Sequence, residues 1–320
     1  MSNNSAEKSD RITAIDTHIH PIRGIATGKS LIKEMDKSGV TSAILLALDL
    51  DPEVLSMNNK LREEIIDDFY AYSYFINPDQ LLDGMKNILI AGQTSNELVA
   101  QICSKFPDRF LGFGSVNPSK TKQYVKRTLQ EIDSLRLRGI KLIPTLQFFY
   151  PNKNKNLKLI FKFAQKRDWT ILIHCGRDPG PFEIPTLRHV KASHPKYWFK
   201  HVEKTKTRVI FAHLGGYGEV GQGENDWLDT VLELASKNPN VYLDTSSVTY
   251  AFNDTNIVSK LRKLGFDRII FGSDTPVVHG TSMEHSKNVI LNTSLLTNKE
   301  KSMILRANAE RIFPEFSSEK

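Results

Sequence analysis

Two histidines at alternate positions are the first residues of this chain that could carry chemistry. His18 and His20 lie in the stretch AIDTHIHP, with only Ile19 between them. In a β-strand, residues two apart point to the same side, so both imidazoles would face one point. Imidazole is poorly suited to an apolar core unless something binds it. One such pair is weak evidence, and its meaning depends on the rest of the chain.

Three later residues could complete a metal site. His174 lies in ILIHCG, His213 in IFAHLGG and Asp274 in FGSDTP, each at the end of an apolar segment. Singly, each has an ordinary interpretation, as a hydrogen-bonded structural histidine or as an aspartate that caps a helix. Imidazole nitrogens and a carboxylate oxygen together suit zinc or a similar divalent ion. The question is whether the fold brings them to one place.

Eight β-rich segments alternate along the chain with amphipathic helical stretches. The segments are TAIDTHIH, TSAILLAL, RFLGFGSVN, RGIKLIPT, WTILIHCG, RVIFAHLGG, NVYLDTSS and RIIFGSDTP. Alternating strand and helix implies parallel strands with right-handed crossovers, and eight units favour a closed (β/α)8 TIM barrel of the α/β class. The alternative, an open doubly wound sheet, usually has a glycine-rich loop after an early strand, and none follows the first two segments.

The five polar residues all lie near the C-terminal ends of their segments, which meet at one rim of a parallel barrel. We therefore predict that they converge there. Extra helices are expected after the second strand, in residues 49–95, and at the C-terminus, in residues 281–313. Because no linker divides the chain, we expect a flexible tail in residues 1–10 and a single barrel domain in residues 11–320.

Composition and apolar patterning indicate the cellular compartment of the protein and the classes of molecule that it binds. No apolar run approaches the ~20 residues that cross a bilayer, and the N-terminus has no secretory signal, so we expect a cytoplasmic protein without membrane contact. Cys103 and Cys175 are expected to be free thiols. The net charge of +7 is compatible with an anionic small-molecule substrate. The basic run in residues 153–166 alternates with apolar residues like a solvated helix face, which disfavours a nucleic-acid partner.

The order of these motifs resembles the amidohydrolase superfamily, specifically the amidohydrolase-related group (amidohydrolase 2) that includes aminocarboxymuconate-semialdehyde decarboxylase. The resemblance runs from about Ile12 to Phe313. It rests on DTHIHP, LIKEMDKSGVTSAIL, NELVAQICSKFPDRFLGFGSVNP, RGIKLIP, ILIHCG, IFAHLGG, NVYLDTSS, IIFGSDTP and ILRANAERIF. It implies one divalent metal ion, with zinc expected and manganese or iron(II) as alternatives, and a homodimer is common among relatives.

The resemblance also implies roles for the rim residues. His213 acts on the substrate or its bound water, and Asp274 doubles as the proton acceptor. The implied metal ligands are His18, His20, His174 and Asp274. Asp16 precedes His18 by two residues and shares its face, so we expect it to orient that ligand.

Three other positions carry weaker expectations. Arg177 could clamp a substrate carboxylate through its planar guanidinium, with a surface salt bridge as the alternative, and His279 could reach the pocket from its loop. Some superfamily members carry a carbamylated lysine at the position of Lys141, which bridges two metals. The alternative is a lysine paired with a carboxylate inside the barrel. Ile143 stands where relatives often carry histidine, which removes a ligand from this strand.

Two reactions fit this set of residues. In hydrolysis a metal-activated water attacks a carbonyl, Asp274 takes the proton and His213 stabilises the oxyanion. In non-oxidative decarboxylation the ion orients a carboxylated aromatic or muconate-like substrate, and an acid protonates carbon as carbon dioxide leaves. A metal-containing binding protein without turnover is a third class, which would need no proton shuttle. We predict a metal-dependent hydrolase of a small carboxylated molecule, with the decarboxylase as the alternative.

Overall fold

One parallel sheet organises the part of the chain that the computed structural model describes, namely residues 12–22, 24, 26–57, 59–60, 62–63, 66, 77–176, 191–217, 227–277 and 282–317. Eight strands pair in chain order. They are β1 (Ala14–Ile19), β2 (Val40–Leu46), β3 (Phe110–Ser115), β4 (Gly139–Leu142), β5 (Thr170–Ile173), β6 (Val209–Phe211), β7 (Val241–Asp244) and β8 (Ile269–Ile270). Each of the eight predicted segments coincides with one of these strands, although β2 begins one residue before its segment.

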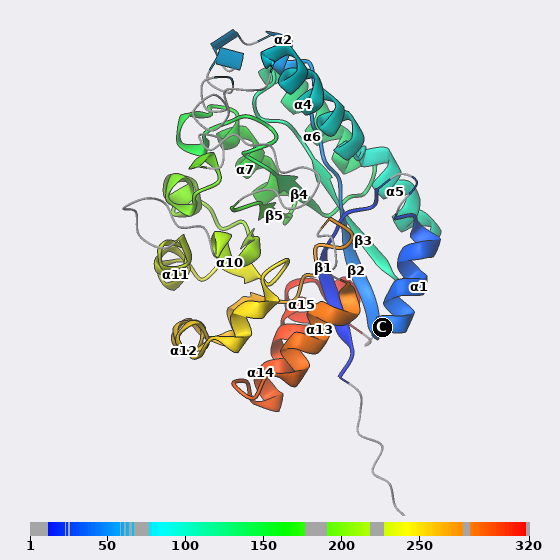
Figure 1. Cartoon of the computed structure of the whole chain (residues 1–320), viewed down its shortest axis with the longest axis vertical. Helices are drawn as coiled ribbons and strands as arrows, with labels where there is room; N and C mark the ends of the chain where they lie inside the picture. The colour runs from blue at the N-terminus through cyan, green and yellow to red at the C-terminus, as the bar shows by residue number, and fades with distance from the viewer. Residues whose placement is uncertain are drawn as a thin grey trace, which may run out of the picture.

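The sheet closes on itself between its first and last strands. The backbone N–H of Thr17 donates to the carbonyl of Phe271 at 2.9 Å, and that of Asp274 donates to the carbonyl of His18 at 2.9 Å. Strand β8 has only two residues, so the segment that follows it makes part of this seam. The predicted TIM barrel is confirmed, with helices around the strands (Figure 1).

The helices connect successive strands around the outside of the barrel. Those before β6 are α1 (Gly28–Ser38), α2 (Val54–Met57), α4 (Pro78–Gly92), α5 (Asn96–Lys105), α6 (Lys122–Ser134), η1 (Pro151–Lys153), α7 (Leu157–Lys166), η3 (Pro195–Trp198) and α9 (Phe199–Val202). Those after it are α10 (His213–Gly216), α11 (Trp227–Lys237), η4 (Thr249–Asn253), α12 (Thr255–Leu264), η5 (Phe266–Arg268), α13 (Met283–Asn292), α14 (Asn298–Ser302), the π-helical turn η6 (Met303–Ala307), α15 (Asn308–Ile312) and η7 (Pro314–Phe316). Thus α2 and α4 lie in the segment after β2, and α13 to α15 follow β8.

Strand residues alternate between two apolar layers. In β5, Ile171 and Ile173 belong to the large cluster between sheet and helices, whereas Leu172 belongs to the cluster inside the barrel. The helices supply the other side of the large cluster: α7, for example, buries Leu157 and Ile160 on one face. This alternation determines which residues at the strand ends point into the barrel.

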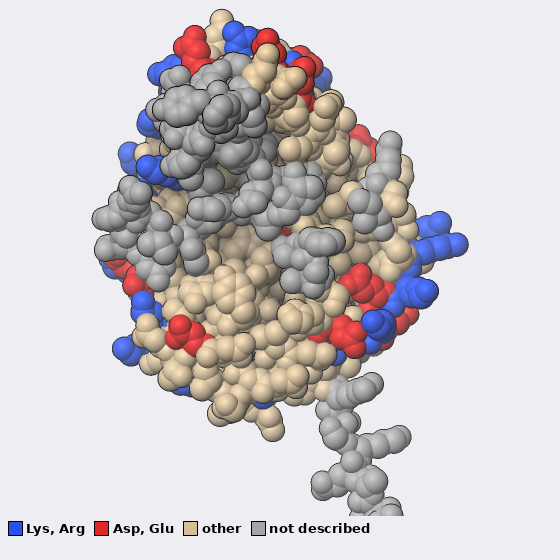
Figure 2. Space-filling view, in the orientation of Figure 1, with Lys and Arg blue, Asp and Glu red and all other residues tan. Residues whose placement is uncertain are grey.

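Charged side chains lie mainly around the edge of the face seen in Figure 2, and uncharged residues occupy most of its described middle. Among the described residues, no helix is both long and apolar enough to cross a membrane. Cys103 and Cys175 are both free, as expected.

Candidate metal centre

Strand alternation carries three polar side chains into the barrel. Ile140 and Leu142 pack outward in β4, so Lys141 between them points inward and is fully buried. By the same rule, His174 lies on the inner side two residues after Leu172. Asp244 ends β7 two residues after Tyr242 of the inner cluster and is also fully buried. These residues reach the centre because regular strands place them there.

Strand β1 departs from this regularity. Its register against β2 shifts between Asp16 and Ile19. Consequently Ala14 and Ile19, five residues apart, both belong to the outer cluster, which a regular strand would not allow. His18 and His20, on either side of Ile19, therefore face the interior.

Two further residues reach the site through left-handed backbone conformations. His213 has φ +57° and Asp274 has φ +66°, a region that non-glycine residues seldom adopt. Regular alternation along β6 would turn His213 outward, since Ala212 before it belongs to the inner cluster. The left-handed turn brings its ring inward, and such strain is concentrated at functional sites.

Three buried ligand atoms converge between the first and last strands. His18 Nε2 and His20 Nε2 are 3.2 Å apart, and Asp274 Oδ1 lies 3.4 Å from each. Among the described residues these form one group of His, Cys, Asp or Glu ligand atoms close enough to share a metal ion. Two donors about 2.1 Å from one ion, at angles of roughly 95–110°, lie about 3.1–3.4 Å apart. The three residues therefore form a site for a divalent metal ion.

The protonation of the two histidines suits metal binding. His18 Nδ1 lies 2.8 Å from Asp244 Oδ2, and because a carboxylate only accepts, Nδ1 carries the proton and Nε2 keeps its lone pair. Burial, with the nearby Lys141 charge, lowers the pKa of His18 well below its usual value. Burial also lowers the pKa of His20, against the opposing pull of Asp274. Neutral imidazole is the form that binds metal.

Asp274 is the anionic member of the group. Its burial disfavours the charge, but the interactions with His18, His20 and His213 outweigh this effect and lower the pKa of the carboxyl. Ser247 Oγ donates to its second oxygen, Oδ2, at 2.5 Å. The carboxylate is therefore held ionised, with one oxygen directed at the histidines and the other fixed by a hydroxyl.

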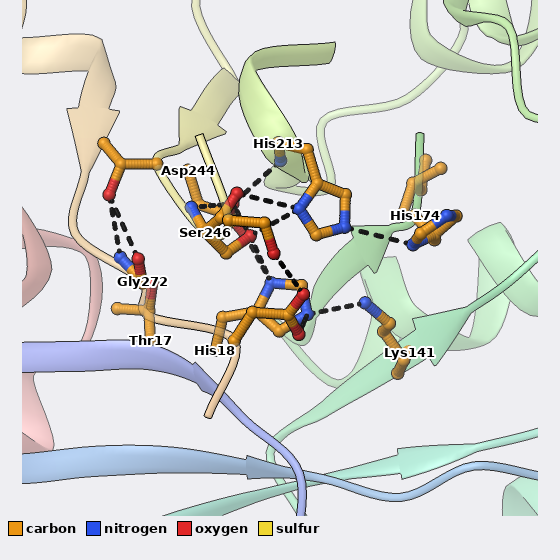
Figure 3. A network of polar contacts seen from close by, with 12 residues as sticks. Thr17, His18, Lys141, His174, His213, Asp244, Ser246 and Gly272 are labelled. Atoms are coloured by element: carbon orange, nitrogen blue, oxygen red, sulfur yellow. Dashed lines mark hydrogen bonds and ion pairs between the residues drawn. The ribbon is translucent and has the colours of Figure 1, made fainter. Parts of the chain in front are cut away.

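His174 and His213 form a separate pair beside this group (Figure 3). His213 Nδ1 lies 2.9 Å from the carbonyl of Ser246, and His174 Nε2 lies 3.1 Å from the carbonyl of Gly176. A nitrogen that faces a carbonyl carries its proton, so the remaining nitrogens are acceptors. These two, His213 Nε2 and His174 Nδ1, face each other at 3.1 Å. Two facing acceptors require a proton or a cation between or beside them.

Lys141 supplies positive charge inside the barrel. Its Nζ lies 3.0 Å from His18 Nε2 (Figure 3). The same nitrogen also faces His20 Nε2. The lysine charge contributes to the lowered pKa values of His18, His20 and His174. This part of the barrel is therefore built for an anionic partner as well as for a cation.

Asp244 and Ser246, which sequence reasoning did not single out, connect the two groups of histidines. Besides His18 Nδ1, Asp244 accepts from the backbone N–H of His213 at 3.0 Å through Oδ1. Ser246 Oγ donates to Asp244 Oδ1 and lies 3.0 Å from His18 Nδ1 and 2.9 Å from His213 Nδ1. The signal available in the sequence was a carboxylate at the end of the seventh segment, NVYLDTSS.

Asp16 has a different place from the one expected. Its Oδ1 accepts from the backbone N–H groups of His18, at 3.1 Å, and Ser273, at 3.0 Å. It thus ties β1 to the segment after β8, and Asp244 contacts the His18 ring instead. The register shift after Asp16 breaks the alternation on which the expectation depended.

The other predicted positions divide into two groups. Cys175 packs in the outer cluster, as expected for a residue that points away from the site. Burial raises the pKa of its thiol well above the usual value. Arg177 and His279 lie outside the described residues.

Comparison with known structures shows the same fold at low identity. An uncharacterised TIM-barrel protein from Bordetella bronchiseptica has a TM-score of 0.67 at 16% identity, covering 95% of this chain and 99% of that one. A probable 2-pyrone-4,6-dicarboxylic acid hydrolase from Acinetobacter baumannii, with citric acid bound, has a TM-score of 0.60 at 15% identity, covering 94% and 99%.

A third similar structure is 5-carboxyvanillate decarboxylase from Novosphingobium aromaticivorans, complexed with manganese and 4-hydroxy-3-methoxy-5-nitrobenzoic acid. Its TM-score is 0.57 at 17% identity, covering 89% of this chain and 79% of that one. Comparison with curated protein sequences finds no match. The family model described as amidohydrolase matches residues 15–314, nearly the whole chain. The chain therefore belongs to the amidohydrolase family and is an enzyme of the amidohydrolase superfamily.

Proposed function

We propose that this enzyme hydrolyses a small carboxylated molecule with the help of one divalent metal ion. The observation that carries the proposal is the convergence of His18 Nε2, His20 Nε2 and Asp274 Oδ1 within 3.2–3.4 Å of one another. The group lies at the C-terminal ends of the strands, where TIM-barrel active sites are built. The similar structure of a probable 2-pyrone-4,6-dicarboxylic acid hydrolase supports the same reaction class.

The ion would be held by His18, His20 and Asp274, with His174 as the fourth ligand that the family resemblance implies. Neutral imidazoles and one carboxylate form a donor set that suits zinc, which we propose first. Manganese is the alternative, because the decarboxylase relative carries it. When bound, such an ion supplies Lewis acidity that activates water and polarises a substrate oxygen.

The protein's own groups divide the remaining work. Asp274 accepts the proton of the attacking water through a carboxylate that Ser247 holds in place. His213 Nε2, an acceptor directed into the site, takes up a proton and then stabilises a developing oxyanion. The Lys141 ammonium, fully buried in the barrel, favours an anionic substrate such as a carboxylate.

Non-oxidative decarboxylation of a carboxylated aromatic or muconate-like substrate is the second candidate. The observation that favours it is the position of His213 beside the proposed ligand His174, with 3.1 Å between Nε2 and Nδ1, because a proton held on His213 Nε2 is available for delivery to carbon. The decarboxylase relative supports it to a similar degree, with a TM-score of 0.57 against 0.60 for the hydrolase relative. The two reactions differ in what they release.

A panel of carboxylated aromatic acids and carboxylated lactones separates the candidates. The purified protein, analysed for metal by elemental analysis, is incubated with each compound while carbon dioxide and acid release are followed. Acid release without gas supports the hydrolase, whereas stoichiometric carbon dioxide supports the decarboxylase. A protein that retains one equivalent of metal but converts no compound on a broad panel would favour a binding function. The expected homodimer, cytoplasmic location and single-domain organisation stay predictions.

A further inference from the structure

A basic groove lies between α7 and α9, on the outer layer of the barrel. It has a volume of about 320 Å³, at the lower end of the range for small-molecule sites. The basic run in residues 153–166, which was expected from the sequence to be a solvated helix face, forms one wall through α7. Neither proposed reaction uses this groove.

Four lysines line the groove, two from each side. Lys158 and Lys162 are one turn apart on α7, and Lys200 and Lys204 are equally spaced on and after α9. All four are exposed, and within the described ranges no carboxylate pairs with any of them. Like charges one turn apart repel each other, so this arrangement is unfavourable without an anion.

The floor of the groove shows the effect of this charge. The His201 ring stacks on Phe161, with centroids 5.6 Å apart, and its Nε2 donates to the carbonyl of Pro151 at 3.0 Å. Burial lowers the pKa of His201, and the charges of Lys200 and Lys204 lower it further, although the Pro151 carbonyl acts against them. The groove therefore has a rigid, uncharged floor beneath a positive rim.

Gln165 adds a polar donor at the end of the groove. Its Oε1 accepts from Thr205 Oγ1 at 3.3 Å and from the backbone N–H of Lys206 at 3.4 Å. These contacts fix the amide group across the two helices and leave its NH2 group to serve as a donor.

We propose that this groove binds a small polyanion that carries at least two phosphate groups. The lysines of the two walls carry more positive charge than one phosphate group can neutralise, whereas a pyrophosphate unit carries enough negative charge to balance most of it. The lysines converge on one short groove, and a nucleic-acid backbone would need an extended basic track. The site is separate from the metal centre, so its occupancy does not depend on the proposed reaction.

Calorimetric titration of the metal-free full-length protein with inorganic pyrophosphate and with ATP tests the proposal. We expect both to bind, and binding to weaken as salt is raised. The double variant Lys162→Ala/Lys204→Ala should weaken both by about tenfold or more, because it removes a charged donor from each wall. The control is Lys29→Ala/Lys33→Ala, an exposed pair one turn apart on α1, which removes the same charge and should leave affinity unchanged.

Several results would overturn the proposal. Absence of binding by both probes would do so, as would an equal loss of affinity in the control variant. Phosphate binding as tightly as pyrophosphate would remove the requirement for two phosphate groups. Vesicles containing phosphatidylserine and a single-stranded oligonucleotide serve as further arms, and binding of these alone would show that the groove recognises a macromolecular surface instead.

Discussion

Asp244 shows how one carboxylate can organise a site without touching its reactants. Oδ2 accepts from the His18 ring, while Oδ1 accepts from Ser246 Oγ and from the backbone N–H groups of His213 and Ser246. The first contact fixes the tautomer of a proposed metal ligand, and the others position the turn that carries His213. Orientation of the proposed ligand His18 and of His213 therefore depends on one side chain.

The variant Asp244→Asn separates these duties. Its amide oxygen can keep the three contacts of Oδ1, which places the NH2 group against His18 Nδ1, where two donors would meet. We expect the protein to fold and its metal affinity to fall by ~10–100-fold, as for other loss of ligand orientation. Competition with a chromophoric chelator measures this affinity, with Asp229→Asn on the surface as control. Unchanged affinity would show that the Asp244–His18 contact is dispensable.

A variant of His213 tests whether this residue holds the metal ion or acts in the reaction. Because it lies outside the three-residue ligand group, His213→Ala should keep most of the metal and lose activity by ~10²–10⁴-fold. His18→Ala should lose both. Elemental analysis and turnover of a substrate from the panel give the two readouts. Metal loss in His213→Ala equal to that in His18→Ala would make His213 a ligand.

Sequence reasoning singled out residues that the structure brings close together, but not all of their partners. The ends of the predicted strands could be located from the apolar segments. They contain His18, His20, His174, His213 and Asp274. The pairing of His174 with His213 could not be read in this way, because it depends on a left-handed turn at His213. Asp244 was missed because a lone aspartate after a strand has many ordinary roles.

The strands and most helices could be predicted at the level of elements. Periodicity gave all eight strands, but it could not give the register shift in β1, since no glycine or proline marks it in the strand sequence AIDTHI. That shift turned Asp16 away from the His18 ring. The seam between β1 and β8 also depends on close backbone approach, which sequence periodicity does not report.

Gly272 permits this approach at the seam. A Cβ added there would lie 2.8 Å from His18 Cβ and 3.3 Å from Ser246 Cβ, so Gly272→Ala must displace His18. We expect destabilisation of ~1–3 kcal/mol from overpacking and weaker metal binding. Denaturant unfolding and chelator competition measure the two effects. Gly84→Ala in α4 is the control, because nothing lies within 4 Å of its added Cβ; equal behaviour of the two variants would contradict this account.

Asp16 makes the same seam sensitive to pH. Burial raises its pKa from 3.8 to about 7, against the hydrogen bonds from Ser273 and His18. The folded protein therefore holds a proton that the unfolded chain has already released between about pH 4 and 7, so this group's contribution to stability falls as pH rises through that window. Above about pH 7 both states are ionised and the contribution is constant. The buried neutral histidines have the opposite slope.

Comparing wild type with Asp16→Asn isolates the contribution of Asp16 to the pH dependence of stability. Asparagine keeps an acceptor for both backbone N–H groups and does not titrate. In chelator-treated protein between pH 5 and 8, the unfolding free energy of wild type relative to Asp16→Asn should fall with rising pH, by up to a few kcal/mol, and level off near pH 7. Asp83→Asn, at an exposed position, should give a flat difference. A wild-type advantage that grows with pH would reverse the sign and refute the assignment.

At the scale of the whole molecule, the proposed metal lies where the first and last strands of the barrel meet. His18 lies in β1, His20 directly follows it, and Asp274 follows β8, so the ligand atoms lie on either side of the seam. The strands there are joined by few backbone hydrogen bonds, since β8 has only two residues. An ion bound across the seam would therefore couple the first and last strands.

Metal binding should accordingly stabilise the entire fold. An ion that binds the native state alone, at a free concentration 100 times its Kd, contributes about 2.7 kcal/mol, which corresponds to a rise in Tm of roughly 4 °C for a chain of this size. Differential scanning calorimetry with and without metal measures this increment. His20→Ala should lose most of it, because one proposed ligand is gone, whereas His285→Ala, at an exposed position on α13, should keep it. An equal increment in His20→Ala would place the stabilising ion elsewhere in the molecule, and the metal would then have no role in closing the barrel.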